Sequence, residues 1–530
     1  MGINMIKTEI KLPVGYTTED VKDAICARLP VGRDEIREIR MLKRELKLAD
    51  GADACYDVSV GVEFSAEREA GLLKMRKKVS QMPDYSFNLP KSAIPDRPVV
   101  IGSGPAGLFA ALALAESGAN PILYERGLPV DERLRAVEKF ETLGILDSEC
   151  NVQFGEGGAG TYSDGKLKVG GMDKYKMKVL VEFVSHGAPE DIAYTVGAHV
   201  GTDKLALIVK GIRERIIALG GEVHFSAKLV KIKVKDGKVV GGTVERGGSR
   251  FDFETSTLVL ATGHSARDVF ELLREVGAPL EAKGFGIGLR IEHPREYINK
   301  LVYGENAEKL GSASYHLVTH LPNGRSAYSF CMCPGGEVVA AASEDGGIVT
   351  NGMSEYARMA DNSNAAFLVS VTPEDFGSDD PLAGIELQRK IERRAYNLTG
   401  NTYKAPVTSL GAFLSGDAPF LGNVKPSYAR GVELFSPEEY LPSFVTDTLK
   451  PAIADFDAWM SGFYYPDAVM CGPETRTTSP VRVLRDGGCE VLGIAGLYPT
   501  GEGAGYAGGI VSSARDGLMV AEKILEKIRK

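Results

Sequence analysis

The sequence predicts an α/β fold whose main part is a parallel sheet followed by a β-meander. An apolar run at 99–101 leads into a glycine cluster and then into a helical pattern. Short alternating stretches between 229 and 255 predict the meander, and an apolar run at 257–261 predicts a further buried strand. Strands that alternate with helical patterns are typical of a parallel sheet covered by helices.

The segment 99–126 has the order strand, glycine turn, helix, strand, acid. Gly102 permits the turn, Gly104 lets the backbone approach a pyrophosphate, and Gly107 lets the helix pack closely on the strand. The helix N-terminus would face the phosphates, and the acid would bind a ribose hydroxyl. The segment therefore predicts a Rossmann-like dinucleotide site with contacts at Gly102, Gly104, Pro105, Ala106, Gly107, Glu125 and Arg126.

Composition narrows the class of protein. The chain has 530 residues, 44% of them hydrophobic and 25% charged, with a formal net charge of −9. These values are typical of a globular enzyme of two to three domains, and the negative charge disfavours nucleic acid as a partner. Residues 1–12 show no signal peptide, and no apolar run is long enough to span a membrane. Seven scattered cysteines predict free thiols and a cytoplasmic location.

Residues 1–95 are predicted to form a small domain of their own. An alternating strand pattern at 6–12, a helical pattern from 17 to 29 and two more alternating stretches precede a helix at 66–79. This order predicts a β-α-β-β-α sandwich. The domain holds 16 Lys and Arg against 15 Asp and Glu, a net charge of +1. We expect it to dock on the rest of the chain or on a second subunit, and an oligomer is left open.

Four further glycine-rich stretches lie far apart, at 154–166, 258–264, 331–336 and 498–510. An NAD-dependent dehydrogenase needs one nucleotide turn, whereas many flavoproteins collect cofactor contacts from widely separated segments. The spread therefore predicts FAD as the nucleotide. Together with the dinucleotide segment, it divides the FAD-binding domain into 96–282 and 481–530, on either side of an inserted α+β substrate domain at 283–480.

In the order of these motifs the chain resembles the two-dinucleotide-binding-domain flavoproteins of the glutathione-reductase type. It looks most similar to a bacterial family of uncharacterised FAD-dependent dehydrogenases. The resemblance implies that the last helix points its positive N-terminus at the flavin ring and stabilises the reduced flavin. For Lys166, a surface position is the alternative. The FAD contacts that the resemblance implies are Gly158, Thr161, Ser163, Lys166, Leu229, Ala261, Thr262, Gly263, Gly501, Glu502, Gly508, Gly509 and Ile510.

The inserted domain carries the catalytic candidates. Its pattern predicts antiparallel strands, a helix at 354–362 and a strand at 365–372. Arg290 lies on a strand that ends at His293, and Arg476 lies near the end of the domain. A fixed cation can hold a substrate carboxylate, and a histidine can donate a proton. The alternatives are structural ion pairs for the two arginines and a turn position for the histidine.

Cys331 and Cys333 share one face of a predicted strand. Their spacing differs from the C-x-x-C of dithiol reductases, and a disulfide between such neighbours in an extended strand would be strained. A redox role and a role as small buried residues both stay open. No cysteine or histidine cluster predicts a metal site.

These patterns predict an FAD-dependent oxidoreductase that moves a hydride between non-covalent flavin and a small organic substrate. Direct use of NAD(P)H as electron donor is left open, because no second complete G-x-G-x-x-G lies between 270 and 480. The alternative is an RNA-interacting or regulatory flavoprotein whose N-terminal domain is the binding module. The near-neutral charge of this domain disfavours the RNA-interacting interpretation.

Substituting Gly509→Asp is expected to impair flavin reduction more than folding. A carboxylate at this helix start opposes the helix dipole and repels the anionic reduced flavin, so less FAD binds or the flavin potential falls. Gly487→Asp, in a turn assigned no flavin contact, is the control. Reductive potentiometric titration compares them, and two variants that both titrate like the parent would show that this helix does not face the flavin.

Overall fold

The computed structural model describes residues 5–48, 54–75, 78–91, 96–167 and 171–528. The chain divides into two compact units. The first unit contains Met1–Asn88, Lys166–His199 and Glu308–Leu310, and the second contains Leu89–Gly165, Val200–Ala307 and Gly311–Lys530. The predicted FAD-binding and substrate domains thus share one unit, and 166–199 groups with the N-terminal residues rather than with the flavin domain.

The first unit is built on a four-stranded antiparallel sheet of order β2-β3-β1-β4. Strand β1 pairs with β3 from Ile6↔Val62 to Pro13↔Cys55, and with β4 on its other side. The order β-α-β-β-α-β with β3 between β1 and β2 is the split arrangement of ferredoxin-like domains. The elements are β1 (Ile6–Pro13), α1 (Thr18–Arg28), β2 (Glu38–Lys47), β3 (Cys55–Glu63), α2 (Ala66–Leu72) and β4 (Val79–Gln81).

Alternation in the strands places one face of this sheet in a core. Ile6, Ile10 and Leu12 are buried, as are the facing residues of β3 and α1. Helix α1 begins with a capping box, in which Thr17 and Asp20 bond each other's backbone N–H groups. The predicted helix at 66–79 is too long: α2 ends at Leu72, and Val79 begins β4, which lengthens the sheet.

The segment 166–199 is tied to β2 within the first unit. The Arg44 guanidinium donates to Asp191 and Thr195, both at 2.8 Å. Its backbone N–H donates to the Tyr194 carbonyl, and its carbonyl accepts from the N–H of Val196. This segment carries α5 (Lys174–Ser185), whose Asp173 side chain caps its first turn.

The second unit contains the predicted parallel sheet, with five strands in the order β23-β11-β5-β6-β7. All four pairings are parallel, and the three residues of β5 and β11 are almost fully buried. The strands are β5 (Val99–Ile101), β6 (Ile122–Tyr124), β7 (Glu222–His224), β11 (Leu258–Leu260) and β23 (Leu497–Pro499). The predicted meander is confirmed as the antiparallel strands β8 (Lys228–Lys235), β9 (Lys238–Arg246) and β10 (Ser249–Glu254).

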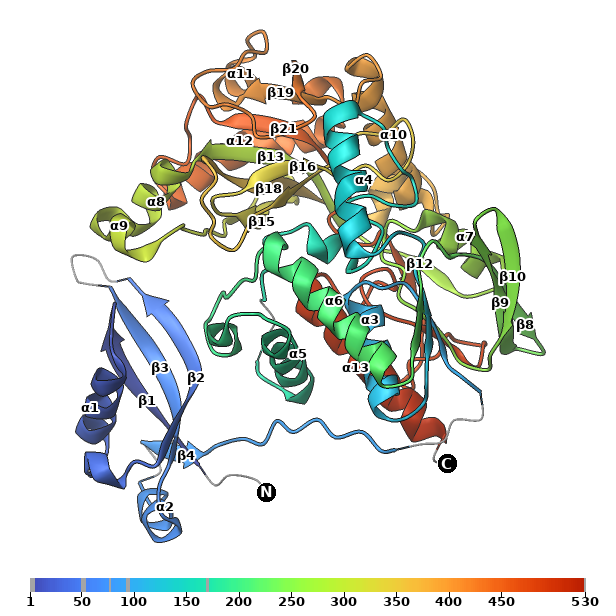
Figure 1. Ribbon diagram of the computed structural model, residues 1–530. Helices are drawn as coiled ribbons and strands as arrows, with labels where there is room; N and C mark the ends of the chain where they lie inside the picture. The colour runs from blue at the N-terminus through green and yellow to red at the C-terminus, as the bar shows by residue number, and fades with distance from the viewer. Residues whose placement is uncertain (1–4, 49–53, 76–77, 92–95, 168–170, 529–530) are drawn as a thin grey trace. The chain divides into compact units, whose positions relative to one another are not determined.

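Three helices of the second unit lie side by side next to this sheet (Figure 1). They are α3 (Pro105–Glu116), α6 (Thr202–Ala218) and α13 (Ile510–Ile528). Helix α3 is buried along most of its length and has no charged residue before Glu116, because helices or strands surround it. A side chain on Gly517 of α13 would collide with the Ala106 carbonyl of α3, so the two helices touch through their backbones.

A seven-stranded sheet of order β14-β15-β18-β13-β21-β19-β20 forms the rest of the second unit. Its long central strand β13 pairs with β18 over ten residues, from Phe285↔Val371 to Pro294↔Asn362. The strands are β13 (Phe285–Pro294), β14 (Val318–His320), β15 (Ser326–Cys333), β18 (Asn362–Val371), β19 (Ala405–Ser409), β20 (Val432–Leu434) and β21 (Val469–Glu474). Strand pairs β12 (Leu280–Ala282) with β22 (Val481–Val483) and β16 (Glu337–Ala340) with β17 (Thr350–Met353) complete the strands.

Helices flank this sheet, and α12 packs against β14, β15 and β18 in one large apolar core. Pro451 lies inside α12, yet the helix continues to Trp459. The remaining helices are α4 (Val130–Leu143), α7 (Arg267–Glu275), α8 (Arg295–Tyr303), α9 (Ala307–Leu310), α10 (Ala383–Leu398), α11 (Leu410–Ser415) and α12 (Ser443–Trp459). In the described part of the chain, no helix has the length and apolarity that crossing a membrane requires.

The helix predicted at 354–362 is wrong. The backbone of Arg358 adopts φ +53°, which ends any right-handed helix, and Ser354 donates to the Pro334 carbonyl. The Tyr356 N–H donates to Asp203 at 2.8 Å, so contacts with distant segments determine this stretch. The strand predicted next is confirmed as β18.

Replacing Asp516 by alanine is expected to lower the free energy of unfolding by about 3–5 kcal/mol. Its buried carboxylate accepts from Thr500, the Gly501 N–H and two nitrogens of Arg485, at 2.6–3.0 Å. Alanine leaves the buried arginine without its counter-charge. Lys523→Ala breaks an exposed ion pair on the same helix and should cost less than about 1 kcal/mol. Urea denaturation of both variants checks this, and equal midpoints would contradict it.

Candidate flavin site

Segments from both ends of the second unit meet at the carboxyl ends of β5, β11 and β23. A Cβ on Gly158 would lie 3.1 Å from the Cα of Gly104, which brings the loop after α4 against the glycine turn after β5. A Cβ on Gly503 would lie 2.5 Å from the Gly263 carbonyl oxygen. Ligands of such sheets bind beyond these strand ends. The structure thus gathers the glycine-rich segments of 102–107, 154–166, 261–264 and 501–510 in one place.

The glycines behind this place allow backbones to touch. A side chain on Gly107 would collide with the Gly102 carbonyl and would lie 3.2 Å from the Cβ of Ala261. A Cβ on Gly501 would lie 2.7 Å from the Cβ of Ala106. These contacts hold α3, the end of β11 and the turn after β23 together as a fixed frame.

In front of this frame the backbone is accessible. The strands that lead into the site are buried, whereas some residues of the turns that follow them are only partly buried. A cradle of exposed peptide groups beside a helix N-terminus suits the phosphates and ring of a dinucleotide. The residues of the cradle that keep exposed surface are Gly104, Pro105, Gly158, Thr262, Gly263, Glu502, Gly508 and Gly509.

Glu125 lies at the end of β6 as predicted, but its carboxylate already holds the protein together. One oxygen accepts from the N–H and the hydroxyl of Ser103, at 2.8 and 2.9 Å. The other accepts from the N–H groups of Gly127 and Gly155, at 2.9 and 3.0 Å. A ribose hydroxyl could replace the Ser103 hydroxyl, which rotates freely. The ribose contact stays a prediction, and Glu125 in addition ties the glycine turn to the next loop.

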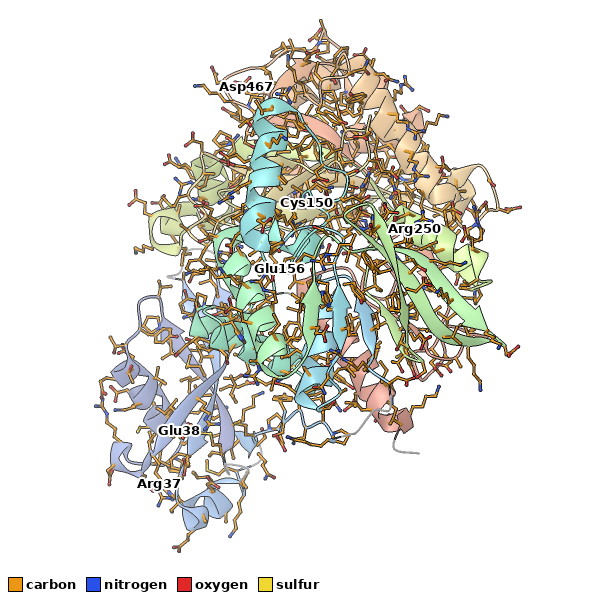
Figure 2. All side chains as sticks on the ribbon, turned by 45° about the vertical axis from the view of Figure 1, so that its right-hand side comes forward. Arg37, Glu38, Cys150, Glu156, Arg250 and Asp467 are labelled. Atoms are coloured by element: carbon orange, nitrogen blue, oxygen red, sulfur yellow. The ribbon has the colours of Figure 1, made fainter. Side chains whose placement is uncertain are left out.

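The loop at 151–156 is held by a buried arginine of α4. Arg133 is fully buried and donates to the carbonyls of Asn151, Val152 and Glu156, at 2.7–2.9 Å. The Glu156 side chain returns to accept from the Val130 N–H at 2.8 Å, at the first turn of α4. Figure 2 shows Glu156 and Cys150 close to this helix. Helix α4 therefore fixes the start of the predicted flavin loop.

The predicted polar contacts of this loop are used within the protein. The Thr161 hydroxyl donates to the Glu156 carbonyl, and the Ser163 hydroxyl donates to the Gly160 carbonyl at 2.7 Å. Lys166 begins the part of the loop that belongs to the first unit, where it forms a β-bridge with His199. Their contacts with FAD stay predictions.

Two further predicted contacts lie after β6 and in β8. The Arg126 guanidinium lies 4.5 Å from the centre of the Phe154 ring and donates to Asp268 at 2.8 Å. Leu229 is buried in β8, where it pairs with Val244 of β9. The adenine contact implied for its backbone stays a prediction.

Beside the cradle lies a group of ionisable side chains. Burial raises the pKa of Glu502 to about 7, and the charge of Lys283 opposes this rise. The imidazole of His264 lies 4.0 Å from the Glu502 carboxylate. Burial lowers the pKa of His264 to about 3, and the charges of Arg476 and Arg267 add to this. At neutral pH the histidine is therefore uncharged, and Glu502 is divided between its two protonation states.

Arg476 belongs to a buried ion network. Its guanidinium donates twice to Glu392, at 3.0 and 2.9 Å, and also to the Ser343 hydroxyl. Arg267 donates to both oxygens of the same carboxylate, at 3.1 and 2.9 Å, and also binds Glu344. Burial raises the pKa of Glu392, but the charges and hydrogen bonds of the two arginines lower it by more. The net pKa therefore lies below the usual value, and this carboxylate stays ionised. The charge of Arg476 acts on His264, and three of the five N–H donors of Arg476 already bind Glu392 and Ser343.

Arg290 is fully buried on β13. It pairs with Glu474 on β21, at 2.5 and 3.0 Å, and its remaining N–H groups donate to the Cys331 carbonyl, Asn364 and Asn351, at 2.7–3.2 Å. A guanidinium has five N–H donors; four of them make these hydrogen bonds, and Nε lies in the ion pair with Glu474. This arrangement favours a positioning role over binding a substrate carboxylate.

His293 lies on the other face of β13 from Arg290, because successive residues of a strand alternate. It is fully buried, its Nε2 lies 3.0 Å from the Phe463 carbonyl, and it packs near Tyr297 and Tyr465. Burial lowers its pKa to about 4, so the ring is uncharged at neutral pH and cannot act as an imidazolium acid there. The catalytic role stays a prediction that this placement does not favour.

Two protein families match consecutive ranges of the chain between 96 and 477. Residues 96–286 match the family described as pyridine nucleotide-disulphide oxidoreductase. Residues 284–477 match the family described as FAD-dependent protein, C-terminal domain-like. An uncharacterized protein of Clostridium beijerinckii is 47% identical over 511 residues, which are 95% of each chain. The chain belongs to this family of FAD-dependent oxidoreductases.

Solved structures show more distant similarity. E. coli quinol fumarate reductase is 14% identical, with a TM-score of 0.36, over 82% of this chain and 70% of that one. A 3-ketosteroid-Δ4-(5α)-dehydrogenase of Rhodococcus jostii RHA1 is 13% identical, with a TM-score of 0.34, over 84% of this chain and all of that one. The FAD-dependent oxidoreductase predicted from the sequence is confirmed by the family matches, whereas the RNA-interacting alternative receives no support.

Several site residues escaped the sequence analysis. His264 directly follows the predicted Ala-Thr-Gly turn, so its position after that strand could have been used to find it. Arg133, Glu392 and Glu474 have no such signal, because each binds groups that only the fold brings near.

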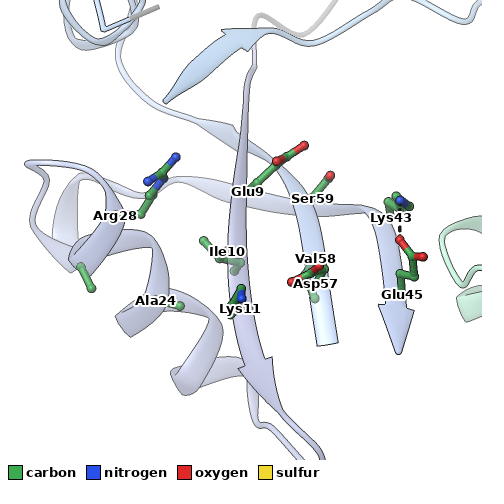
Figure 3. A pocket seen from close by; sticks show the side chains of 11 residues that line it. Glu9, Ile10, Lys11, Ala24, Arg28, Lys43, Glu45, Asp57, Val58 and Ser59 are labelled. Carbon is green, nitrogen blue, oxygen red and sulfur yellow. Dashed lines mark hydrogen bonds and ion pairs between the residues drawn. The ribbon is translucent and has the colours of Figure 1, made fainter. Parts of the chain in front are cut away.

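The first unit of this oxidoreductase has an open pocket of about 650 Å³ (Figure 3). Its charged lining mixes both signs, and Glu45 pairs with Lys43 at 2.7 Å. The two neighbouring lysines, Lys43 and Lys47, lower the pKa of Glu45 to about 2. A balanced lining of this kind lacks the positive surface that a nucleic acid requires.

The described residues contain no cluster of metal-ligating side chains.

The charge of Glu125 is expected to matter for cofactor binding. Glu125→Gln keeps its size but turns an amide NH₂ toward N–H groups, so the turn and loop lose charge-assisted hydrogen bonds worth about 1.5–3 kcal/mol. We expect the Kd for FAD to rise by about tenfold or more in reconstitution of the apoprotein. Glu116→Gln, which breaks an exposed pair with Arg215, is the control. Equal affinities would refute the assignment.

Proposed function

We propose that this oxidoreductase binds one non-covalent FAD in the cradle and moves a hydride between the flavin and a small organic substrate. The observation that carries the proposal is the meeting of four glycine-rich segments, from 102 to 510 in the sequence, with exposed backbone in front and backbone contacts behind. When bound, FAD supplies the two-electron chemistry. The protein has to bind it, orient it and adjust its charge.

The start of α13 is the part of the site that acts on the flavin's charge. Gly508 and Gly509 are exposed, and the helix that follows has 19 residues. The positive end of such a helix stabilises a nearby anion. Gly509 leaves this helix end open, since a Cβ there would have only the Ser512 hydroxyl near it, at 3.9 Å. In this proposal Glu502 lies along the ribityl chain.

Lys283, His264 and Arg476 form the side on which the substrate would bind. Burial lowers the pKa of Lys283, and the charge of Arg482 adds to this. The neutral imidazole of His264 can donate or accept a hydrogen bond. These groups suit a substrate with a carbonyl or carboxylate oxygen next to the carbon that exchanges hydride.

NAD(P)H is the proposed electron donor, which the match of 96–286 to a pyridine-nucleotide oxidoreductase family supports. A cytoplasmic location is proposed as well, since all seven cysteines are free thiols.

The decisive experiment combines cofactor release with anaerobic reduction. The purified protein should be yellow, and mild acid should release one FAD per chain. Addition of NADH or NADPH without oxygen should bleach the flavin band, and carbonyl or unsaturated acids are then screened for reoxidation. Release of NAD alone, or failure to take up FAD on reconstitution, would refute the proposal.

Glu502 is expected to make the flavin potential depend on pH. Its raised pKa means that it is protonated below pH 7 and negatively charged above. The charge disfavours the anionic reduced flavin, so the potential of the wild type should fall relative to Glu502→Gln only above pH 7. A difference on the order of 30 mV at pH 8.5, equivalent to about 1.4 kcal/mol, should vanish at pH 5.5.

Glu305→Gln, an exposed carboxylate outside the site, is the control for this measurement and should match the wild type at both pH values. A constant difference between Glu502→Gln and wild type at all pH values would contradict the assignment.

A further inference from the structure

His264 is a buried side chain at the edge of the cradle, and its outer ring nitrogen has no hydrogen-bond partner among the described residues. It directly follows Gly263, whose carbonyl a Cβ on Gly503 would strike. Only 8% of the surface of His264 is exposed, and its one hydrogen bond is made by the inner nitrogen, Nδ1. The outer nitrogen, Nε2, lies 4.0 Å from a carboxyl oxygen of Glu502. A buried polar atom that faces the cradle without a partner points to a ligand.

The inner nitrogen belongs to a chain of three hydrogen bonds. Nδ1 of His264 lies 3.2 Å from the hydroxyl oxygen of Ser265. The same hydroxyl lies 3.2 Å from the amide oxygen of Gln153, whose amide nitrogen lies 3.5 Å from the Ala341 carbonyl oxygen. Ser265 and Gln153 are both buried, so the chain runs from the cradle into the protein.

The protons of this chain can be assigned from its inner end. The Ala341 carbonyl can only accept, so Gln153 turns its NH₂ group toward it and its amide oxygen toward Ser265. That amide oxygen can only accept as well, so the single hydroxyl proton of Ser265 is donated to it. The hydroxyl oxygen then accepts from Nδ1, and His264 carries a proton there.

A neutral histidine with its proton on Nδ1 has a bare Nε2. His264 is neutral, because burial and the charges of Arg476 and Arg267 lower its pKa to about 3. The nitrogen that faces the cradle is therefore an acceptor only. A hydroxyl group can donate to it, whereas a carbonyl oxygen would set lone pair against lone pair.

We propose that Nε2 of His264 accepts a hydrogen bond from a hydroxyl group of the substrate, so that the site binds alcohols in preference to the matching carbonyl compounds. The inference rests on the proposed function, in which His264 lies on the substrate side of the cradle. It narrows the substrate class to compounds that present a hydroxyl group. Ser265 and Gln153 are positioning residues, since they act by fixing the proton of His264 on Nδ1.

The first test locates the proton on the ring. Holoprotein labelled with ¹⁵N-histidine is measured by long-range ¹H–¹⁵N NMR, in which protonated and bare ring nitrogens resonate in separate ranges. His264→Gln identifies the signals of His264 among the seven histidines. We expect a protonated Nδ1 and a bare Nε2. A proton on Nε2 would overturn the proposal.

Ser265→Ala tests the cause of this arrangement. Without the hydroxyl, Nδ1 loses its acceptor, so the proton should be shared between the two nitrogens and their signals should move toward each other. Ser256→Ala, at an exposed serine before the same strand, is the control and should keep the wild-type signals. Wild-type signals in Ser265→Ala would contradict the assigned chain.

The second test compares a donor with an acceptor. The oxidised holoprotein is titrated with 2,2,2-trifluoroethanol, which donates a strong hydrogen bond, and with acetone, which can only accept. Trifluoroethanol should move the Nε2 signal to saturation with a Kd at least tenfold below that of acetone, and Ser265→Ala should lose this difference. Equal effects of the two probes, or no effect of trifluoroethanol, would count against the proposal.

FAD also carries hydroxyl groups, on its ribityl chain, and the apoprotein separates this source from the substrate. If the Nε2 signal moves when FAD binds and trifluoroethanol adds nothing, the hydroxyl belongs to the cofactor and the substrate assignment is overturned. A protein that takes up no FAD refutes the proposed function, while its histidine signals still report the position of the proton.

Discussion

Backbone contact of α3 with the turn after β5 and with α13 is the constraint on which the rest of the second unit depends. Gly107 packs on the Gly102 carbonyl and Gly517 on the Ala106 carbonyl, and any side chain at either glycine would force these elements apart. The Asp516 carboxylate adds a polar link, because it holds both Arg485 and the loop before α13. The last helix must therefore return to the first strand of the sheet. The cradle exists only when both ends of the unit are in place.

The same constraint explains what the sequence could predict. A glycine turn between an apolar strand and a helix has a local cause, so the motif at 102–107, the parallel sheet and the final helix were all predicted from the residues themselves. The strand β18 was also predictable, since its apolar run is buried on both faces. The helix expected at 354–362 failed because distant partners, Asp164 and Asp203, hold that stretch.

Contacts between side chains that are far apart in the sequence also limited the prediction of the site. Arg290 was recognised as a cation, but its partner Glu474 lies 184 residues away. The pairing of Arg476 with Glu392 across 84 residues has no local signal either. His293 shows the opposite case: strand alternation places it on the other face from Arg290, and that was readable from the sequence. The glycine contacts of the site were predictable, and the charge balance around it was not.

This charge balance bears on what the site can hold. The ion network that includes Arg476 contains Arg267, Arg389 and Arg476 against Glu344, Glu386 and Glu392, so its charges balance. Because these charges are paired with one another, the network adds little net attraction for an anion. Lys283 supplies the positive charge on this side of the cradle, and Glu502 opposes it only when ionised. Because that carboxyl ionises near pH 7, the attraction for an anion is greatest below neutrality and weakens as the pH rises. The side chain beside the proposed ribityl chain therefore also adjusts the charge that a substrate meets.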